Sequence, residues 1–516
     1  MLNFDTNGTI EKREVVAAMV KPNPQMSLSN EEFSKLEKRA MDEIISPQNG
    51  NPKFVSWDSE SDPSNPLNWP EGRKWFVTIL TSFGGLITLM SGPMLAPALG
   101  AIGKDLEISA ADATMTMSIY VLAFAFGPMI LAPCSEVWGR RPIWILGSAW
   151  YVLWNTVCGF SNSKDLLIIG RLLSGLGASA EFAVSGPIAA DIWRAKDRGK
   201  SMAVRSFFPL LGPALGPIVG GVMTETTSWR WLFWVLSILD TAVLLLFIIS
   251  LPETHTPTLL SRKAASLRKS TNENYCTPED ITSPTLIHRL QVGLLRPLRL
   301  LVLEPVIYLT AFLQAYQFGI LYIVHSTFAT LWIDRYEQPT AASGLHYLAI
   351  VVGCMIGAIG GGWATDRIWA ILKKEHGGRT KPENRVPILL PGIIMLPVGL
   401  LWYGWAAQAQ MHWIVPDIGI AIFGCGYMVG GTTISAYVVD AFLSHTASAG
   451  AASMFPRNIF AFGFPIFGPS LYAKLDYGFG NTLLAGIAIV VGFPATYVLW
   501  RFGEQLRAGG KGIEQN

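Results

Sequence analysis

The sequence predicts an all-α membrane protein with twelve transmembrane helices in two pseudo-symmetric six-helix bundles. Half of its 516 residues are hydrophobic and only 15% are charged, whereas soluble domains carry roughly 25% charged residues. The charges gather in short stretches between apolar runs of about 20 residues, the length at which a helix crosses a bilayer. A polar stretch from about Glu253 to Leu303 divides these runs into six and six, a division typical of secondary transporters.

The apolar runs fix the expected units. We expect helices near residues 75–98, 113–133, 142–160, 165–188, 203–223, 231–251, 305–327, 343–365, 386–406, 412–435, 449–472 and 480–501. The expected domains are a mostly disordered tail (1–72), a first bundle (73–252), a central cytoplasmic loop (253–303), a second bundle (304–502) and a short tail (503–516).

The basic residues predict the orientation. Most of the 39 Lys and Arg residues fall in the tails and in alternate loops, and such loops stay in the cytoplasm. We therefore expect both termini in the cytoplasm. The first 70 residues are polar and contain no secretory signal.

Several functional classes find no support in the chain. It contains no G-x-x-x-x-G-K-[ST] nucleotide loop, no G-x-S-x-G elbow and no H-E-x-x-H run, so neither ATP-driven transport nor enzymatic hydrolysis is expected. The five cysteines show no disulfide or metal-ligand spacing. A net charge of +2 gives no sign of nucleic-acid binding. We expect no cofactor, no metal and no obligate protein partner.

Two motifs suggest moving parts. The loop after the second helix carries a charged group that recurs in the other half, and we expect it to act as a gating latch. Its residues are Glu136, Gly139, Arg140 and Arg141, echoed by Asp366 and Arg367. The fifth helix carries glycines every four residues, which permit close helix approach, and prolines that bend it. They form either a packing face or the hinge on which two bundles rock. Its residues are Gly212, Pro213, Gly216, Pro217, Gly220 and Gly221.

These stretches resemble known motifs. The fifth helix resembles the antiporter motif C of the major facilitator superfamily, the loop at 132–141 resembles motif A, and Arg171–Ala178 resembles motif B. The stretch Asp62–Trp69 before the first helix is similar to the fungal branch of the twelve-spanning drug:proton antiporter-1 family. The resemblance implies the major facilitator fold, a fungal plasma membrane and a role for Arg171 in proton coupling. Motif A departs from the family pattern in having Glu136 for aspartate.

Charged residues inside the spans are functional candidates because burial in a bilayer costs about 2.5–3.5 kcal/mol on insertion scales. We expect Arg171, Glu181 and Asp240 to couple protons, although Asp240 could also be a hydrogen-bonded structural residue. Glu181 lies ten residues beyond Arg171, about 15 Å along a helix, too far for a direct pair. We assign Asp440 and Arg457 to contacts between the bundles, with Arg457 either paired to an acid or closing its helix.

Polar and aromatic residues on the expected cavity-facing helices suit an amphipathic organic substrate. Interhelical hydrogen bonding explains each of them equally well. The candidates are Gln314, Tyr316, Gln317, Tyr322, His346 and Tyr427.

The sequence thus predicts a secondary transporter that exports a small organic compound, a metabolite or xenobiotic, in exchange for protons. The expected partners are the substrate, protons and the lipid bilayer. Proton-coupled uptake, or transport of organic acids or polyamines, remains an alternative. A non-transporting nutrient receptor is an alternative of another class.

Overall fold

The computed structural model describes residues 53–194, 197–277, 286–375, 381–442 and 446–508. The long helices of the first half are α3 (Glu71–Met90), α5 (Ala110–Trp138), α6 (Arg140–Gly159), α7 (Lys164–Ile192), α8 (Arg198–Thr226) and α9 (Arg230–Ser250). Those of the second half are α13 (Pro305–Thr330), α15 (Tyr347–Glu375), α16 (Val386–Gln408), α17 (Ile414–Ala441) and α18 (Thr446–Ala508).

The described chain contains the twelve spans that the sequence predicts. Ten stretches are long and apolar enough to cross a membrane. The last of them holds two helices, because the backbone of Asp476 turns the chain within α18 (φ 56°). Helix α6 is not among the ten, because its Trp, Tyr and Asn side chains lower its hydropathy, but its 20 residues are long enough. With these two helices the number of spans is twelve.

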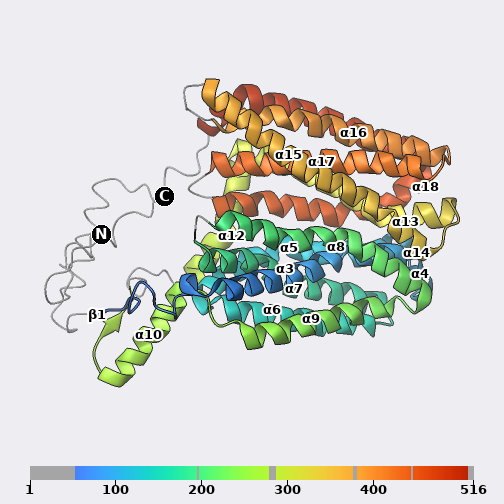
Figure 1. Ribbon diagram of the computed structural model, residues 1–516. Helices are drawn as coiled ribbons and strands as arrows, with labels where there is room; N and C mark the ends of the chain where they lie inside the picture. The colour runs from blue at the N-terminus through green and yellow to red at the C-terminus, as the bar shows by residue number, and fades with distance from the viewer. Residues whose placement is uncertain (1–52, 195–196, 278–285, 376–380, 443–445, 509–516) are drawn as a thin grey trace.

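The helices run roughly parallel and antiparallel between two ends of the molecule (Figure 1). We call the end near β1 (Lys53–Phe54), α10 (Thr256–Thr271) and α12 (Leu286–Leu303) the tail end. The opposite end, where α4 (Leu99–Asp105) and α14 (Thr340–Leu345) lie, is the far end. The first half, blue to green, lies against the second half, yellow to red.

The first span is not one continuous helix. Helix α3 ends at Met90, a tight 3-10 helix η2 follows over Pro93–Ala98, and α4 continues to the far end. Pro93 and Pro97 explain this break, because proline cannot donate the backbone hydrogen bond that an α-helix needs. The break exposes backbone groups of Ser91 to other helices.

The segment before the first span packs on the loop between the halves. Strand β1 pairs in parallel with β2 (Tyr275–Cys276), and Lys263 Nζ lies 2.6 Å from Asp58 Oδ1. The short helix η1 (Pro66–Asn68) follows. Asp62 accepts backbone N–H groups of Asp58 and Ser64, and these bonds lower the pKa of its carboxyl. Residues 1–52 and 509–516, most of the two predicted tails, lie outside the described residues.

The two halves touch mainly through two pairs of helices. Helix α5 packs on α18, where the rings of Phe126 and Phe455 meet edge to face at 5.3 Å. Helix α8 packs on α14 at the far end, where Glu225 Oε2 accepts the backbone N–H of Ala341 at 2.7 Å. The loop helix α12 contacts both α5 and α18, so it bridges the halves at the tail end.

The glycines of α8 serve close packing within one half. A Cβ on Gly220 would lie 2.1 Å from the carbonyl oxygen of Met94, and Gly212 and Gly216 also face the backbone of the first span. This face therefore packs within the first half, and the hinge role of these glycines stays a prediction. The face carrying Gly221 and Pro217 does meet the other half, against Thr340 and Gly344. Pro213 lies inside the same helix.

Candidate functional site

Two pockets among the helices share the lining residue Arg457. We refer to them together as the central cavity and to each as a lobe. The aromatic lobe, about 50 Å³, takes residues from both halves: Thr88, Tyr120, Phe124, Phe182, Phe318, Tyr322, Arg457 and Asn458 are among them. The polar lobe, about 350 Å³, is built by α13, α17 and α18: it includes Gln314, Gln317, Tyr427, Thr432, Ser435 and Arg457. Arg457 lies 11 residues into α18, about 16 Å from its start, which is near mid-depth.

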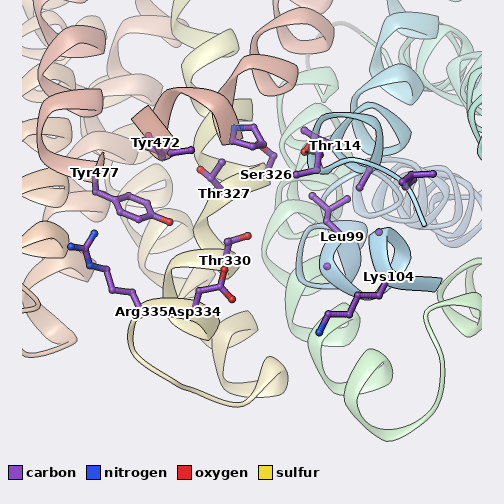
Figure 2. A pocket seen from close by; sticks show the side chains of 17 residues that line it. Leu99, Lys104, Thr114, Ser326, Thr327, Thr330, Asp334, Arg335, Tyr472 and Tyr477 are labelled. Atoms are coloured by element: carbon purple, nitrogen blue, oxygen red, sulfur yellow. Dashed lines mark hydrogen bonds between the residues drawn. The ribbon is translucent and has the colours of Figure 1, made fainter. Parts of the chain in front are cut away.

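A larger pocket of about 750 Å³ opens between the halves at the far end (Figure 2). Thr114, Leu99 and Lys104 line one side, and side chains of α13, η3 (Leu331–Arg335) and α18 line the other. Arg335 pairs there with Asp476. At the far end the two halves are therefore separated by a wide pocket.

Four of the six predicted cavity residues line the central cavity. Gln314, Gln317 and Tyr427 line the polar lobe and Tyr322 lines the aromatic lobe. Tyr316 points the other way, and its hydroxyl donates to the carbonyl of Leu484 at 2.7 Å.

His346 also lies away from the described lobes. Its ring bonds Asp417 Oδ2 at 2.7 Å and Gln338 Oε1 at 2.8 Å, and it stacks on Trp332 with ring centroids 3.7 Å apart. The prediction that Tyr316 and His346 line the cavity is wrong, because both side chains satisfy hydrogen bonds inside the second half.

The predicted contact of Asp440 and Arg457 between the bundles does not occur. Asp440 Oδ2 pairs with Arg385 Nε at 2.6 Å, within the second half. Arg457 makes no ion pair among the described residues. Its guanidinium lies over the ring of Phe318, 4.6 Å from the centroid.

Arg171 is fully buried in the first half and has no carboxylate partner among the described residues. Its guanidinium donates to the carbonyl of Thr116, to the hydroxyl of Ser91 and to the carbonyl of Ser91, each at 3.1 Å. The ring of Tyr120 covers it at 4.2 Å. The break in the first span leaves the Ser91 carbonyl available, so Arg171 ties the broken helix to α5.

Glu181 and Asp240 form a pair of buried carboxyl groups. Glu181 Oε2 accepts the hydroxyl of Thr88 at 2.8 Å, and Asp240 Oδ2 accepts the hydroxyl of Ser148 at 2.7 Å. Their other oxygens, Glu181 Oε1 and Asp240 Oδ1, have no hydrogen-bond partner in the described structure. The two groups are close enough to act on each other.

Thr88 connects this pair to the central cavity. Its side chain lines the aromatic lobe and bonds Glu181, while its carbonyl accepts the hydroxyl of Tyr120 at 2.9 Å. One hydroxyl thus separates a buried carboxyl from the space in which a substrate would lie. Thr88 could not be singled out from the sequence, because a threonine in an apolar helix usually bonds its own backbone.

The charged loop at the tail end is organised by Glu253, which the sequence analysis did not assign to the latch. Gly139 adopts φ +102° and lies against the Glu253 carboxylate. That carboxylate accepts the backbone N–H of Arg140 at 2.9 Å and of Arg141 at 3.3 Å, at the start of α6. It also accepts the N–H groups of residues 254 and 255. A negative charge at a helix amino terminus is favourable.

The side chains of the latch pair differently from the expectation. Arg140 Nε lies 3.5 Å from Asp191 Oδ2, and Arg141 donates to the carbonyl of Ile248. Glu136 is exposed and has no ion pair among the described residues. In the other half Arg367 is exposed and lies over the ring of Trp363; the side chain of Asp366 is outside the described part.

Twelve spans in two halves, with a cavity between them at mid-depth, define a membrane transporter. The sequence profile of the Major Facilitator Superfamily matches residues 81–468. The efflux pump vrtL of Penicillium aethiopicum is 39% identical over 462 residues, which are 89% of this chain and 91% of vrtL. An uncharacterized transporter of Schizosaccharomyces pombe is 38% identical over 478 residues, 92% of this chain and 97% of that one.

Solved structures share the fold. The inward-open xylose transporter XylE from E. coli superposes with a TM-score of 0.62 over 83% of this chain and 96% of XylE, at 14% sequence identity. The chain belongs to the major facilitator superfamily, and its similarity to fungal efflux pumps confirms the resemblance that its motifs indicated.

We predict that Glu253→Ala lowers the free energy of unfolding by about 1–3 kcal/mol, because the backbone N–H groups around α6 lose a buried acceptor. Thermal unfolding of the purified protein in detergent measures the loss. Glu136→Ala is the matched control and should change the free energy by less than about 0.5 kcal/mol. If Glu136→Ala lowers the free energy of unfolding as much as Glu253→Ala or more, Glu136 and not Glu253 organises the loop, as the motif predicts.

Proposed function

We propose that this protein exports a small organic compound, a fungal metabolite or xenobiotic, across the plasma membrane in exchange for protons. Both termini lie in the cytoplasm, and alternating access of the central cavity moves the compound. Similarity to fungal efflux pumps such as vrtL supports export. The proton gradient supplies the energy, and no cofactor or chemical step takes part.

The observation that carries the proposal is the enclosed pair of Glu181 and Asp240. Two neighbouring carboxyl groups in an apolar interior cannot readily both be ionised, so we assign the pair one shared proton. Opening the cavity to water at Thr88 would let that proton leave. Such a site binds a proton when closed and exchanges it when wet, which is what coupling requires.

Arg171 supports the pair without touching it. It holds Ser91, three residues beyond Thr88, against Thr116 of α5. We assign Arg171 as a positioning residue that fixes the broken first span beside the carboxyl pair. Because its hydrogen bonds to Thr116 and Ser91 lie within the first half, it moves with that half as a unit.

Alternating access requires that contacts between the two halves can separate. The far-end pocket is wide while α12, α5 and α18 meet at the tail end. With the termini in the cytoplasm, the far end lies on the outer side of the membrane. The wide far-end pocket therefore opens toward the outside. The opposite state would part α5 from α18 and close the far end.

We predict that deletion of the gene raises the intracellular amount of the exported compound and lowers its amount in the medium. A protonophore should have the same effect in cells that carry the gene, because it removes the driving force. Untargeted metabolite profiling of cells and medium measures both and identifies the compound. The opposite change would establish uptake, and unchanged profiles with altered signalling would establish a receptor.

We predict that Glu181→Gln and Asp240→Asn each abolish the transport driven by a pH gradient, because neither variant can share a proton across the pair. The measurement is flux of the profiled compound into proteoliposomes, with and without a pH gradient. Asp417→Asn is the matched control, since Asp417 is a buried carboxyl bonded to His346 outside the pair.

The flux of the Asp417→Asn control should still depend on the pH gradient. Arg171→Ala should weaken the dependence and also lower thermal stability, as befits a positioning residue. Normal gradient-driven flux in both pair variants would remove the pair from the coupling mechanism.

A further inference from the structure

Arg457 is a cation at mid-depth of the membrane whose donors remain available. It forms no ion pair among the described residues, and its Nε is buried without a hydrogen-bond partner. The face of Phe318 supports the guanidinium at 4.6 Å. A guanidinium has five N–H donors, and one aromatic face does not satisfy them.

Three other arginines of the described spans have hydrogen-bond or ion-pair partners. Arg205 donates to the hydroxyl of Ser185 at 3.0 Å, although its Nε is also buried without a partner. The three donating nitrogens of Arg171 bond Thr116 and Ser91. Arg385 pairs with Asp440. An isolated charge in a membrane interior is costly unless it is paired or hydrated. Arg457 is partly exposed and lines the polar lobe, so its guanidinium is available to a partner that enters there.

The surroundings of Arg457 indicate what such a partner is. Gln317 is 3% exposed, lines the polar lobe, and leaves its Oε1 without a hydrogen-bond partner. Gln314 and Ser435 add polar groups to the same lobe. On the other side of Arg457, the aromatic lobe offers ring faces: Phe318 contacts Tyr322 with centroids 5.0 Å apart.

The lining therefore combines a fixed positive charge with flat aromatic walls. Phe318 also stacks on Tyr427 with an angle of 21° between the rings, and Phe124 and Phe182 meet edge to face at 6.2 Å. Aromatic faces favour flat ring systems, and a guanidinium favours a carboxylate or another oxyanion through charge-assisted hydrogen bonds.

We infer that the substrate is an acidic aromatic compound whose carboxylate, phenolate or enolate oxygen binds Arg457 while its rings occupy the roomier polar lobe beside Tyr427. This inference rests on the proposed function and specifies its substrate class. The negative group lies where the two lobes meet, because Arg457 lines both. Gln317 adds a hydrogen bond to a neighbouring polar group of the compound.

The test is equilibrium dialysis of the purified full-length protein in lipid nanodiscs with three matched probes. They are anthraquinone-2-carboxylate, its primary amide, and the aminomethyl compound, which is a cation at neutral pH. We expect the carboxylate to bind about tenfold or more tightly than the amide, the effect of a hydrogen bond to a charged group. The cation should bind most weakly.

Variants of Arg457 test whether this residue causes the preference for the carboxylate probe. Arg457→Gln should remove the difference between carboxylate and amide, whereas Arg457→Lys should keep part of it. Arg501→Gln is the matched control, because Arg501 is exposed near the end of the same described segment, α18, and it should bind all three probes as the unchanged protein does. Equal binding of the three probes by the unchanged protein, no binding of any, or a preference that survives in Arg457→Gln would overturn the inference.

The outcome is independent of the transport mechanism. Dialysis is done without a pH gradient, so a carboxylate preference without gradient-driven flux would contradict proton antiport and leave the substrate class standing. Gradient-driven flux of a cationic or neutral compound, without that preference, would contradict the substrate class and leave antiport standing.

Discussion

Every charge inside the bundle must find a partner, because hydrocarbon and packed protein cannot solvate it. This constraint sorts the ionisable groups of the spans into three states. Arg171 is satisfied by a hydroxyl and by backbone carbonyls. Glu181 and Asp240 are buried and each keeps one carboxyl oxygen without a hydrogen-bond partner among the described residues, and Arg457 is left open toward the central cavity. The functional assignments follow from which ionisable groups have protein partners and which do not.

The two halves hold different parts of the proposed exchange. The first half contains the carboxyl pair, and the second half contributes the cation and most of the polar lobe. Thr88 and Phe318 lie in the same lobe, so a bound substrate would affect both halves at once. An acidic compound that leaves while a proton enters moves net positive charge inward. A negative interior potential favours that exchange by about 2.3 kcal/mol per charge for each 100 mV.

The sequence was sufficient to predict the twelve spans, because run length and charge placement follow directly from the bilayer. It also singled out Glu181 and Asp240, since a carboxylate in an apolar run is conspicuous, but only the packing of α7 and α9 on α6 brings them into one region. The directions of Tyr316 and His346 were not predictable, because helices surrounded by other helices and lipid have no polar face that fixes their rotation. Phe124 and Phe182 were missed for the same reason: a cavity phenylalanine and a lipid-facing one are alike in sequence.

The central claim is that the Glu181–Asp240 pair holds a shared proton while it is enclosed. Infrared spectroscopy of the purified protein in lipid at neutral pH detects the C=O stretch of a protonated carboxyl group. The account predicts such a band in the unchanged protein, altered in each single variant and absent in the double variant Glu181→Gln with Asp240→Asn, while Asp417→Asn leaves it unchanged. A spectrum in which the double variant and the unchanged protein have the same protonated-carboxyl signal would contradict the claim.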